Sequence, residues 1–235
     1  MIVVTFALPA ESSEFLRLLQ EPKRERSDSI ERISGTLHGQ DVCVMHTGVS
    51  EQSTRARLGT FLEGQRPSLL ISSGFAGALC DGYEVGDLLF SENFSDRIPL
   101  AAARSALGET RAKIASLTTA HTVIDSVETR RQIAEKTGAA AVDMETEFIA
   151  ELCAARGIPL LSLRAITDTP AVPFPAPPGV LFNFERQRTE FAPLFWYLVI
   201  RPFAIARFIA FAHNIAKSRT ALTAALELLL RGPLV

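Results

Sequence analysis

The hydrophobic and polar positions along this chain follow two alternating patterns. Short apolar runs, typical of buried strands, occupy residues 2–8, 42–46, 69–73 and 160–166. Segments with apolar residues at helical spacing lie between or after these runs and predict helices over 11–20, 51–63 and 129–137. Residues 34–45 predict a hairpin that turns at His38-Gly39-Gln40-Asp41. Strands that alternate with helices in this way are typical of an α/β domain.

Length and composition narrow the class further. A chain of 235 residues can build one α/β domain with a sizeable core, so we expect a single domain over 1–235. The net charge of -2 gives no reason to expect a nucleic-acid partner. Three widely spaced cysteines favour neither a disulfide framework nor a metal site, and they fit a reducing cytoplasm. The first residues indicate a buried strand and not an export signal.

Carboxylates gather at two junctions late in the chain. Val142-Asp143-Met144-Glu145-Thr146-Glu147 runs into apolar residues at helical spacing, so these acids lie at the start of a helix. Gly157-Ile158-Pro159 ends that helix, and the strand 160–166 leaves Thr167 and Asp168 at its carboxyl end. Open α/β sheets bind their ligands at such ends.

Three segments resemble the nucleoside phosphorylase and nucleosidase superfamily, most closely the hydrolytic branch typified by methylthioadenosine/S-adenosylhomocysteine nucleosidases. They are Ala7-Leu8-Pro9-Ala10-Glu11, Ser73-Gly74-Phe75-Ala76-Gly77 with Val85-Gly86-Asp87, and 143–168, where Val142-Asp143-Met144-Glu145 resembles the family's V-E-M-E. The resemblance covers residues 1–170 and implies a central mixed sheet flanked by helices. It also implies cleavage of the N-glycosidic bond of an adenosine-like purine nucleoside, with no cofactor and no metal.

The resemblance assigns two catalytic residues. Asp168 would protonate the purine at N7, and Glu11 would activate the attacking water. An aspartate with its ordinary pKa of about 3.9 is ionised at neutral pH, so Asp168 needs burial or hydrogen bonds that raise the pKa. The alternatives are that Asp168 caps the turn that follows it and that Glu11 is a first-turn helix acid favoured by the helix dipole.

The substrate-binding residues also follow from the resemblance. Glu145 would accept hydrogen bonds from the ribose hydroxyls, and Met144 would pack against the sugar. The alternatives are a solvated acid at the helix start and an ordinary core methionine. The other expected binding residues are Gly48, Gly74, Phe75 and Val123, of which the two glycines let the backbone approach a ligand or simply form turns.

Four further residues near these motifs receive structural expectations. We expect Asp143 and Glu147 to face away from the substrate, and Arg164 to neutralise one of the carboxylates. His121 is expected to be a structural residue.

The sequence favours water over phosphate as the nucleophile. The G-D-P-x-R turn of bacterial purine phosphorylases is absent, and Ser72 and Phe75 stand where those enzymes offer an arginine and a serine. Phosphate would therefore lose its charged partner. A phosphate-dependent purine nucleoside phosphorylase stays open as an alternative, as does an inactive membrane-associated or interaction protein on the same fold.

The last third of the chain departs from this pattern. Residues 169–179 hold five prolines, which predict a stiff connection that borders the site as a lid or merely links elements. We expect residues 180–235 to be an apolar-basic helical extension, and Arg201, Pro202 and Arg207 interrupt its apolar run too often for a membrane span. From Glu185 onward the chain has seven Arg or Lys residues and three Glu residues, and this net positive charge suits binding to an anionic membrane surface. The alternative is helices packed against the domain or against a second subunit.

The sequence of this extension, with Arg201-Pro202 followed by an aliphatic and basic helix, also resembles that of nucleoside phosphorylase-like proteins associated with hopanoid synthesis. That resemblance implies a lipid-linked, adenosylhopane-type nucleoside as substrate, with futalosine-type hydrolysis as another candidate. The superfamily resemblance implies a homo-oligomer. The cysteines and the apolar-basic tail together lead us to expect a cytoplasmic location with peripheral contact to the inner membrane surface.

Overall fold

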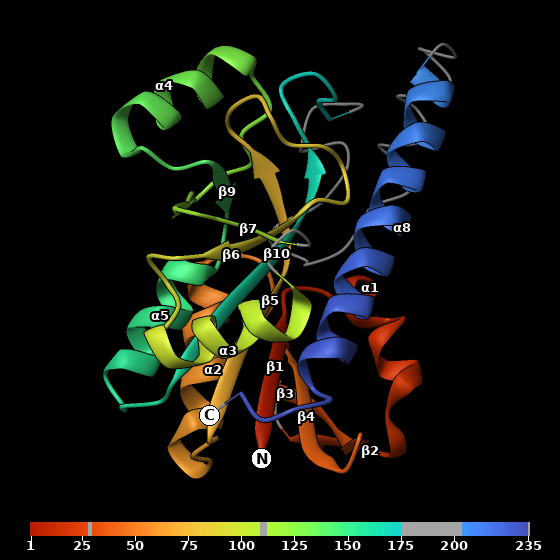
Figure 1. The fold of residues 1–235 in the computed structure, drawn as a ribbon, viewed down its shortest axis with the longest axis vertical. Coiled ribbons are helices and arrows are strands. Elements are labelled where there is room, and N and C mark those ends of the chain that lie inside the picture. The colour runs from red at the N-terminus through yellow and green to blue at the C-terminus, as the bar shows by residue number, and fades with distance from the viewer. Residues whose placement is uncertain (28–29, 109–111, 175–203, 235) are drawn as a thin grey trace.

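The computed structural model describes residues 1–27, 30–108, 112–174 and 204–234 (Figure 1). The apolar run 191–200 and the expected start of the extension at residue 180 lie outside these ranges. Within them, the chain forms one sheet with helices on both faces, which confirms the expected α/β architecture with a central mixed sheet.

Four parallel strands form the middle of the sheet. They are β4 (Gln40–His46), β1 (Ile2–Phe6), β5 (Leu69–Ala78) and β10 (Leu160–Asp168), in that spatial order. Every residue of β1 and β10 is buried, because helices cover both faces of a parallel sheet. All four predicted apolar strands are therefore confirmed, and β5 extends beyond its predicted end at residue 73.

Antiparallel and short strands complete the sheet. On the β4 side lie β3 (Ile30–Leu37) and β2 (Gln20–Ser27), and on the β10 side lie β6 (Leu88–Ser91) and β7 (Ala112–Ala115). The hairpin of β3 and β4 turns at His38-Gly39, as predicted. Strand β9 (Ala141–Asp143) pairs with the end of β5 and with β8 (Leu117–Thr119), and it thereby brings Asp143 beside the carboxyl end of β5.

The helices divide into two layers. Helices α2 (Glu51–Gly64) and α5 (Thr146–Ala154) pack on one face, while α3 (Arg97–Leu107) and α8 (Ala204–Leu229) pack on the other (Figure 1). Helix α4 (Val127–Thr137) lies beyond the carboxyl end of β5 and ends at Gly138, which adopts a left-handed conformation, as predicted.

The predicted helix over 11–20 is wrong. The chain instead forms one helical turn, α1 (Pro9–Ser12), then the 3-10 turn η1 (Phe15–Leu18), and then enters β2. Leu19 already has extended dihedral angles, and Gln20 pairs with Thr36 of β3. Pairing with the neighbouring strand overrides the helical spacing of the apolar residues. The short α1 turn places Glu11 directly after β1.

Helix α8 has two dissimilar halves. In the C-terminal half, Leu222, Leu226 and Leu229 are buried in the same core as β1 and β10. In the N-terminal half, Ile205 and Ile209 are 46% and 55% exposed. Within the described ranges, no helix is both long enough and apolar enough to cross a bilayer. The C-terminal half of α8 is therefore part of the domain core, as the alternative interpretation of the tail expected.

Replacing Leu226 by Ala should lower the free energy of unfolding by about 2–5 kcal/mol, because a fully buried leucine leaves a cavity against the sheet. The matched control, Ile209→Ala on the exposed half of the same helix, should change it by less than about 0.5 kcal/mol. Urea denaturation of both variants measures the difference. Equal losses of stability would contradict the assignment of α8 to the core.

Candidate active site

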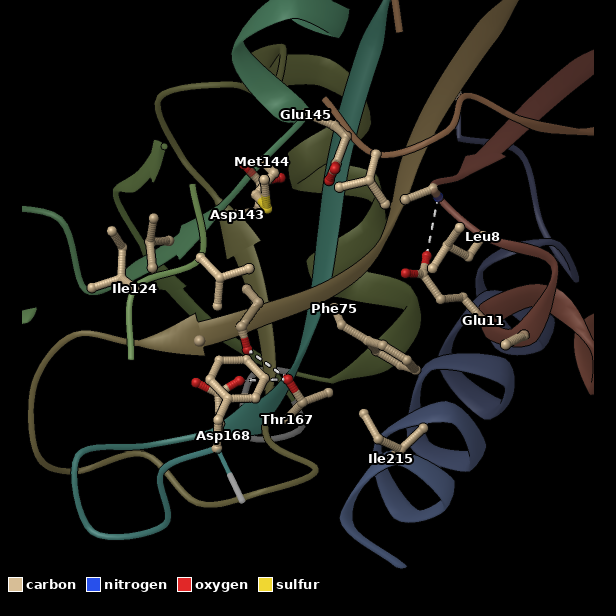
Figure 2. A pocket seen from close by; sticks show the side chains of 18 of the residues that line it. Leu8, Glu11, Phe75, Ile124, Asp143, Met144, Glu145, Thr167, Asp168 and Ile215 are labelled. Atoms are coloured by element: carbon tan, nitrogen blue, oxygen red, sulfur yellow. Dashed lines mark hydrogen bonds between the residues drawn. The ribbon is translucent and has the colours of Figure 1, made fainter. Parts of the chain in front are cut away.

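A cavity of about 430 Å³ opens at the carboxyl ends of β1, β5 and β10 (Figure 2). The loop after β1 contributes Glu11, the junction of β9 and α5 contributes Glu145, and the end of β10 contributes Asp168. These three acids enter from three directions around one space. Most of the remaining lining is apolar. The structure thus brings together the three acids that the sequence analysis selected.

Glu11 is held by the backbone of its own loop. Its Oε2 atom accepts a hydrogen bond from the backbone N–H of Ala7 at 3.1 Å. Burial raises the pKa of Glu11 to about 7, because removing a carboxylate from water penalises its charged form more than Arg164 and the backbone donors stabilise it. The side chain therefore changes its charge near neutral pH, which suits a general base.

The two predicted binding glycines do not line the cavity. A Cβ atom at Gly74 would lie 3.1 Å from Glu11 Oε2, so this glycine leaves room for the Glu11 carboxyl. Gly48 has a φ of 77°, and its N–H donates to the carbonyl of Ala7 at 3.0 Å. That N–H is therefore occupied within the protein, and Gly48 serves the turn that supports the Glu11 loop.

Asp143 borders the cavity, but its side chain is 0% exposed and its carboxylate is turned to Arg164 and Thr146, so it faces away from the substrate space, as expected. Its Oδ2 atom accepts a hydrogen bond from Arg164 Nε at 2.9 Å, and Thr146 donates to the same carboxylate through its hydroxyl and its N–H. Arg164 also donates to Ser72 at 2.8 Å. Arg164 is therefore the residue that neutralises a carboxylate, as expected, and the carboxylate is that of Asp143. Glu147 is exposed, as expected.

Glu145 and Met144 follow Asp143 into the cavity wall. The Glu145 carboxyl points toward the space (Figure 2) and is buried. Burial raises the pKa of Glu145 well above its usual range, and the negative charges of Asp143 and Glu11 raise it further. Met144 lines the same wall and is only partly buried, so it is not an ordinary core methionine.

Asp168 is held on both carboxyl oxygens. Its Oδ1 atom accepts a hydrogen bond from the Thr167 hydroxyl at 2.8 Å, and its Oδ2 atom forms an ion pair with Arg130 Nη2. Burial raises the pKa of Asp168, while the Arg130 guanidinium and the Thr167 hydroxyl act in the opposite direction. A Cβ atom at Gly77 would lie 2.7 Å from Asp168 Oδ2, so a glycine is needed there for the pair to form.

Arg130 is the important residue that the sequence analysis missed. It lies on α4 and is 1% exposed, although the neighbouring Arg131 has a side chain that is 64% exposed. The sequence carries one signal, because Ile133 and Ala134 follow Arg130 at helical spacing and pack into a hydrophobic cluster. Arg130 therefore belongs to the inward face of α4.

The segment between β8 and α4 forms another wall. Thr122, Val123 and Ile124 line the cavity, as predicted for Val123. The carbonyl of Ile124 accepts a hydrogen bond from Arg130 Nη2 at 2.9 Å, which connects this segment to Asp168. His121 has a side chain that is 75% exposed and lies outside the cavity lining.

Apolar side chains cover the side of the cavity next to Glu11. Phe75, expected at the site, lies between Glu11 and Asp168 in Figure 2, and Ile215 of α8 lies next to it. Phe211 of α8 packs on Phe174 with ring centroids 5.5 Å apart, so the proline-rich connection and α8 meet at this wall. Phe174 of this connection therefore lines the site, whereas the prolines at 175, 177 and 178 lie outside the described ranges.

The described residues hold no cluster of three or more His, Cys, Asp or Glu side chains suited to a metal ion. The three cysteines carry no disulfide. The cavity presents three carboxyls: Glu11 with a pKa of about 7, Asp168 bound by a threonine and an arginine, and Glu145 from a third direction.

Comparisons with known proteins agree with this geometry. The pattern of the phosphorylase superfamily matches residues 1–114 and 99–193. The 5'-methylthioadenosine/S-adenosylhomocysteine nucleosidase of Shewanella halifaxensis is 25% identical over 69% of this chain and 83% of that protein.

Two solved structures share the fold. The MTA/SAH nucleosidase of Streptococcus pneumoniae, in complex with 8-aminoadenine, has a TM-score of 0.75 at 17% identity and covers 99% of both chains. The futalosine hydrolase of Helicobacter pylori has a TM-score of 0.73 at 17% identity and covers 97% of this chain and 96% of its own. The chain therefore belongs to the phosphorylase superfamily and is an enzyme of that group.

Proposed function

We propose that this protein hydrolyses the N-glycosidic bond of an adenosine-like purine nucleoside. The observation that carries the proposal is the position of Glu11, Glu145 and Asp168, three buried carboxyls that converge on one cavity at the carboxyl ends of the central strands. Hydrolysis of such a bond needs an acid for the leaving base and a base for water on opposite sides of the sugar. The nucleosidase relatives support this reaction class.

Glu11 is proposed as the general base. With a pKa of about 7, a substantial fraction of its side chains is ionised at neutral pH and can take a proton from water. Glu145 is proposed to bind the ribose hydroxyls, because its carboxyl enters the cavity from a side separate from the other two acids and Met144 lies beside it to contact the sugar.

Asp168 is proposed as the general acid that protonates the base at N7. Its burial favours the proton-bearing form, which a free aspartate does not hold at neutral pH. The wall of Thr122, Val123 and Ile124 lies on the same side and is proposed to contact the purine. Protonation of the base removes the negative charge that would otherwise develop as the glycosidic bond breaks.

Water is favoured over phosphate as the nucleophile. Among the described residues that line the cavity, none is an arginine or a lysine. The two nearby guanidinium groups already bind acids, Arg164 at Asp143 and Arg130 at Asp168. A phosphate dianion would therefore enter beside two buried glutamates without a cation to balance it.

The apolar wall suggests the nature of the 5' substituent. Phe75 and Ile215 lie near Glu11, and Phe211 of the same helix as Ile215 also lines the cavity; we propose that these side chains exclude water from a group attached to the sugar. We propose that this group is apolar. The largest 5' group considered is that of a lipid-linked, adenosylhopane-type nucleoside, which could extend from this wall along α8 over the exposed Ile205 and Ile209. The smallest is a methylthio group.

Peripheral membrane contact, a cytoplasmic location and a homo-oligomer stay predictions of the sequence. The structure changes how membrane contact would arise, because Arg219 is bound to Glu14 at 2.9 Å and Arg207 donates to the carbonyl of Phe174. A bilayer would therefore meet the exposed Ile205 and Ile209 first, and not a row of free basic side chains.

Asp168→Asn should reduce kcat for release of adenine by about 100- to 10,000-fold, because an amide keeps the shape of the side chain but cannot donate a carboxyl proton. The control is Asp41→Asn, an exposed aspartate at the far end of β4, which should keep wild-type kcat. Steady-state kinetics with a purine nucleoside measure both, and circular dichroism verifies that each variant is folded. Retention of a third of the wild-type kcat by folded Asp168→Asn would remove this residue from the mechanism.

Glu11→Gln should abolish hydrolysis, whereas the exposed Glu63→Gln should not affect it. A general base works in its ionised form, so wild-type kcat/KM should fall as pH decreases through about 7, the pKa of Glu11. The pH–rate profile of the wild-type enzyme tests this dependence. A profile that stays flat from pH 8 to pH 5, or an active Glu11→Gln variant, would exclude Glu11 as the base.

Phe211→Ala should raise KM for a nucleoside with a 5'-alkylthio group by about tenfold, which corresponds to about 1.4 kcal/mol of lost apolar contact. KM for adenosine, which carries only a hydroxyl there, should change by less than about twofold. The matched control is the exposed Ile209→Ala, which should alter neither value. If Phe211→Ala affects both substrates equally, this wall does not contact the 5' group.

A further inference from the structure

A buried arginine stands behind the proposed acid. The Arg130 and Asp168 side chains are 1% and 2% exposed and form an ion pair through Nη2 and Oδ2. Arg130 also donates to the carbonyl of Ala78 at 2.7 Å and to the carbonyl of Ile124 at 2.9 Å. One guanidinium therefore links the end of β5, the segment before α4 and the acid.

Two observations indicate that Arg130 acts on Asp168 and not on a ligand. Arg130 does not itself line the cavity, so it has no direct contact with a ligand there. The backbone beside the pair is a glycine, and a Cβ atom at Gly77 would lie 2.7 Å from Asp168 Oδ2 and 3.0 Å from Arg130 Nη1. Any larger residue at this place would push the two charged groups apart.

We propose that Arg130 is a positioning residue that fixes the orientation of the Asp168 carboxyl and limits how firmly it holds its proton. This inference rests on the proposed function of Asp168 as an acid. Because Arg130 occupies Oδ2, the proton that is transferred must reside on Oδ1, the oxygen next to the Thr167 hydroxyl. The hydroxyl can then turn toward the Ala76 carbonyl, which lies 3.5 Å away.

The electrostatics give the direction of the effect. Among the described residues, Arg130 is the charged group in contact with Asp168; Glu11 and Glu145 enter the same cavity from other elements, and the buried Asp143 borders it. Burial raises the pKa of Asp168 and the guanidinium counteracts that rise. Without Arg130 the acid would bind its proton too tightly, and it would donate that proton to the base less readily.

The hydrogen bond to Ile124 adds a second role. This hydrogen bond holds the segment 122–124, which is proposed to contact the purine, in a fixed position relative to Asp168, which is proposed to protonate the purine. A loss of Arg130 should therefore affect both the chemical step and the fit of the base, whereas a purely structural residue would only lower stability.

The test compares Arg130→Gln, Arg130→Lys and the control Arg131→Gln, whose side chain is exposed on the same helix. In Arg130→Gln, kcat should fall at least about tenfold, and the limb of the pH–rate profile set by Asp168 should move up by about one to three pH units. The shift is upward whether that limb lies above or below the one set by Glu11. Arg130→Lys should show smaller changes in the same direction, because one ammonium cannot reach all three acceptors. Arg131→Gln should match the wild type.

Direct titration of Asp168 by carbon NMR of labelled aspartate separates this inference from the proposed function. If the wild type releases no base from any nucleoside, the proposed function fails, yet the carboxyl of Arg130→Gln should still titrate at higher pH than that of the wild type. If Arg130→Gln is folded and both its pH limbs and its Asp168 titration match the wild type, the inference is overturned. If Arg130→Gln does not fold, an unchanged profile and titration in Arg130→Lys overturn it.

Discussion

The ion pair between Arg164 and Asp143 is the interaction on which the rest of the site depends. Arg164 comes from the fully buried β10 and binds Asp143 at the end of β9, Thr146 at the start of α5 and Ser72 on β5. It therefore joins four elements at the carboxyl edge of the sheet. Burying both charges is tolerable because each satisfies the other. Since the guanidinium binds Asp143, no ion pair with another described residue holds Glu11 or Glu145 in its charged form, and burial raises the pKa of both.

A second buried guanidinium, that of Arg130, forms an ion pair with the third acid of the cavity, Asp168. Arg130 binds Asp168 directly, so burial and ion pairing oppose each other at that carboxyl. The cavity thus holds three acids in three electrostatic settings, although all three enter one space and two of them are of the same residue type. Such separation allows one fold to use one carboxyl as an acid and another as a base at the same pH. On β5, Gly74 leaves room for the Glu11 carboxyl and Gly77 leaves room for the Asp168 carboxyl.

The sequence predicted the central strands because their signals are local: a parallel sheet covered on both faces makes β1, β4, β5 and β10 continuous apolar runs. Glu11 and Asp168 lie at or after the ends of two such runs, whereas Glu145 follows the short β9, and all three acids were selected by the resemblance of their motifs to the nucleosidase family. The helix over 11–20 failed because Phe15 and Leu19 have helical spacing, whereas pairing of β2 with β3 decides the structure there. The role of Arg130 could not be predicted, since it is defined by a partner far along the chain, Asp168.

The fate of the attacking oxygen tests the central claim, hydrolysis by Glu11 and Asp168, most directly. The wild-type enzyme would be incubated with an adenosine-like nucleoside in water enriched in oxygen-18, with and without inorganic phosphate. Mass spectrometry would then determine the masses of the products. The account predicts free adenine and a free pentose that carries one oxygen-18 atom at C1', at a rate that phosphate does not change. A pentose 1-phosphate without the label, formed only when phosphate is present, would contradict it.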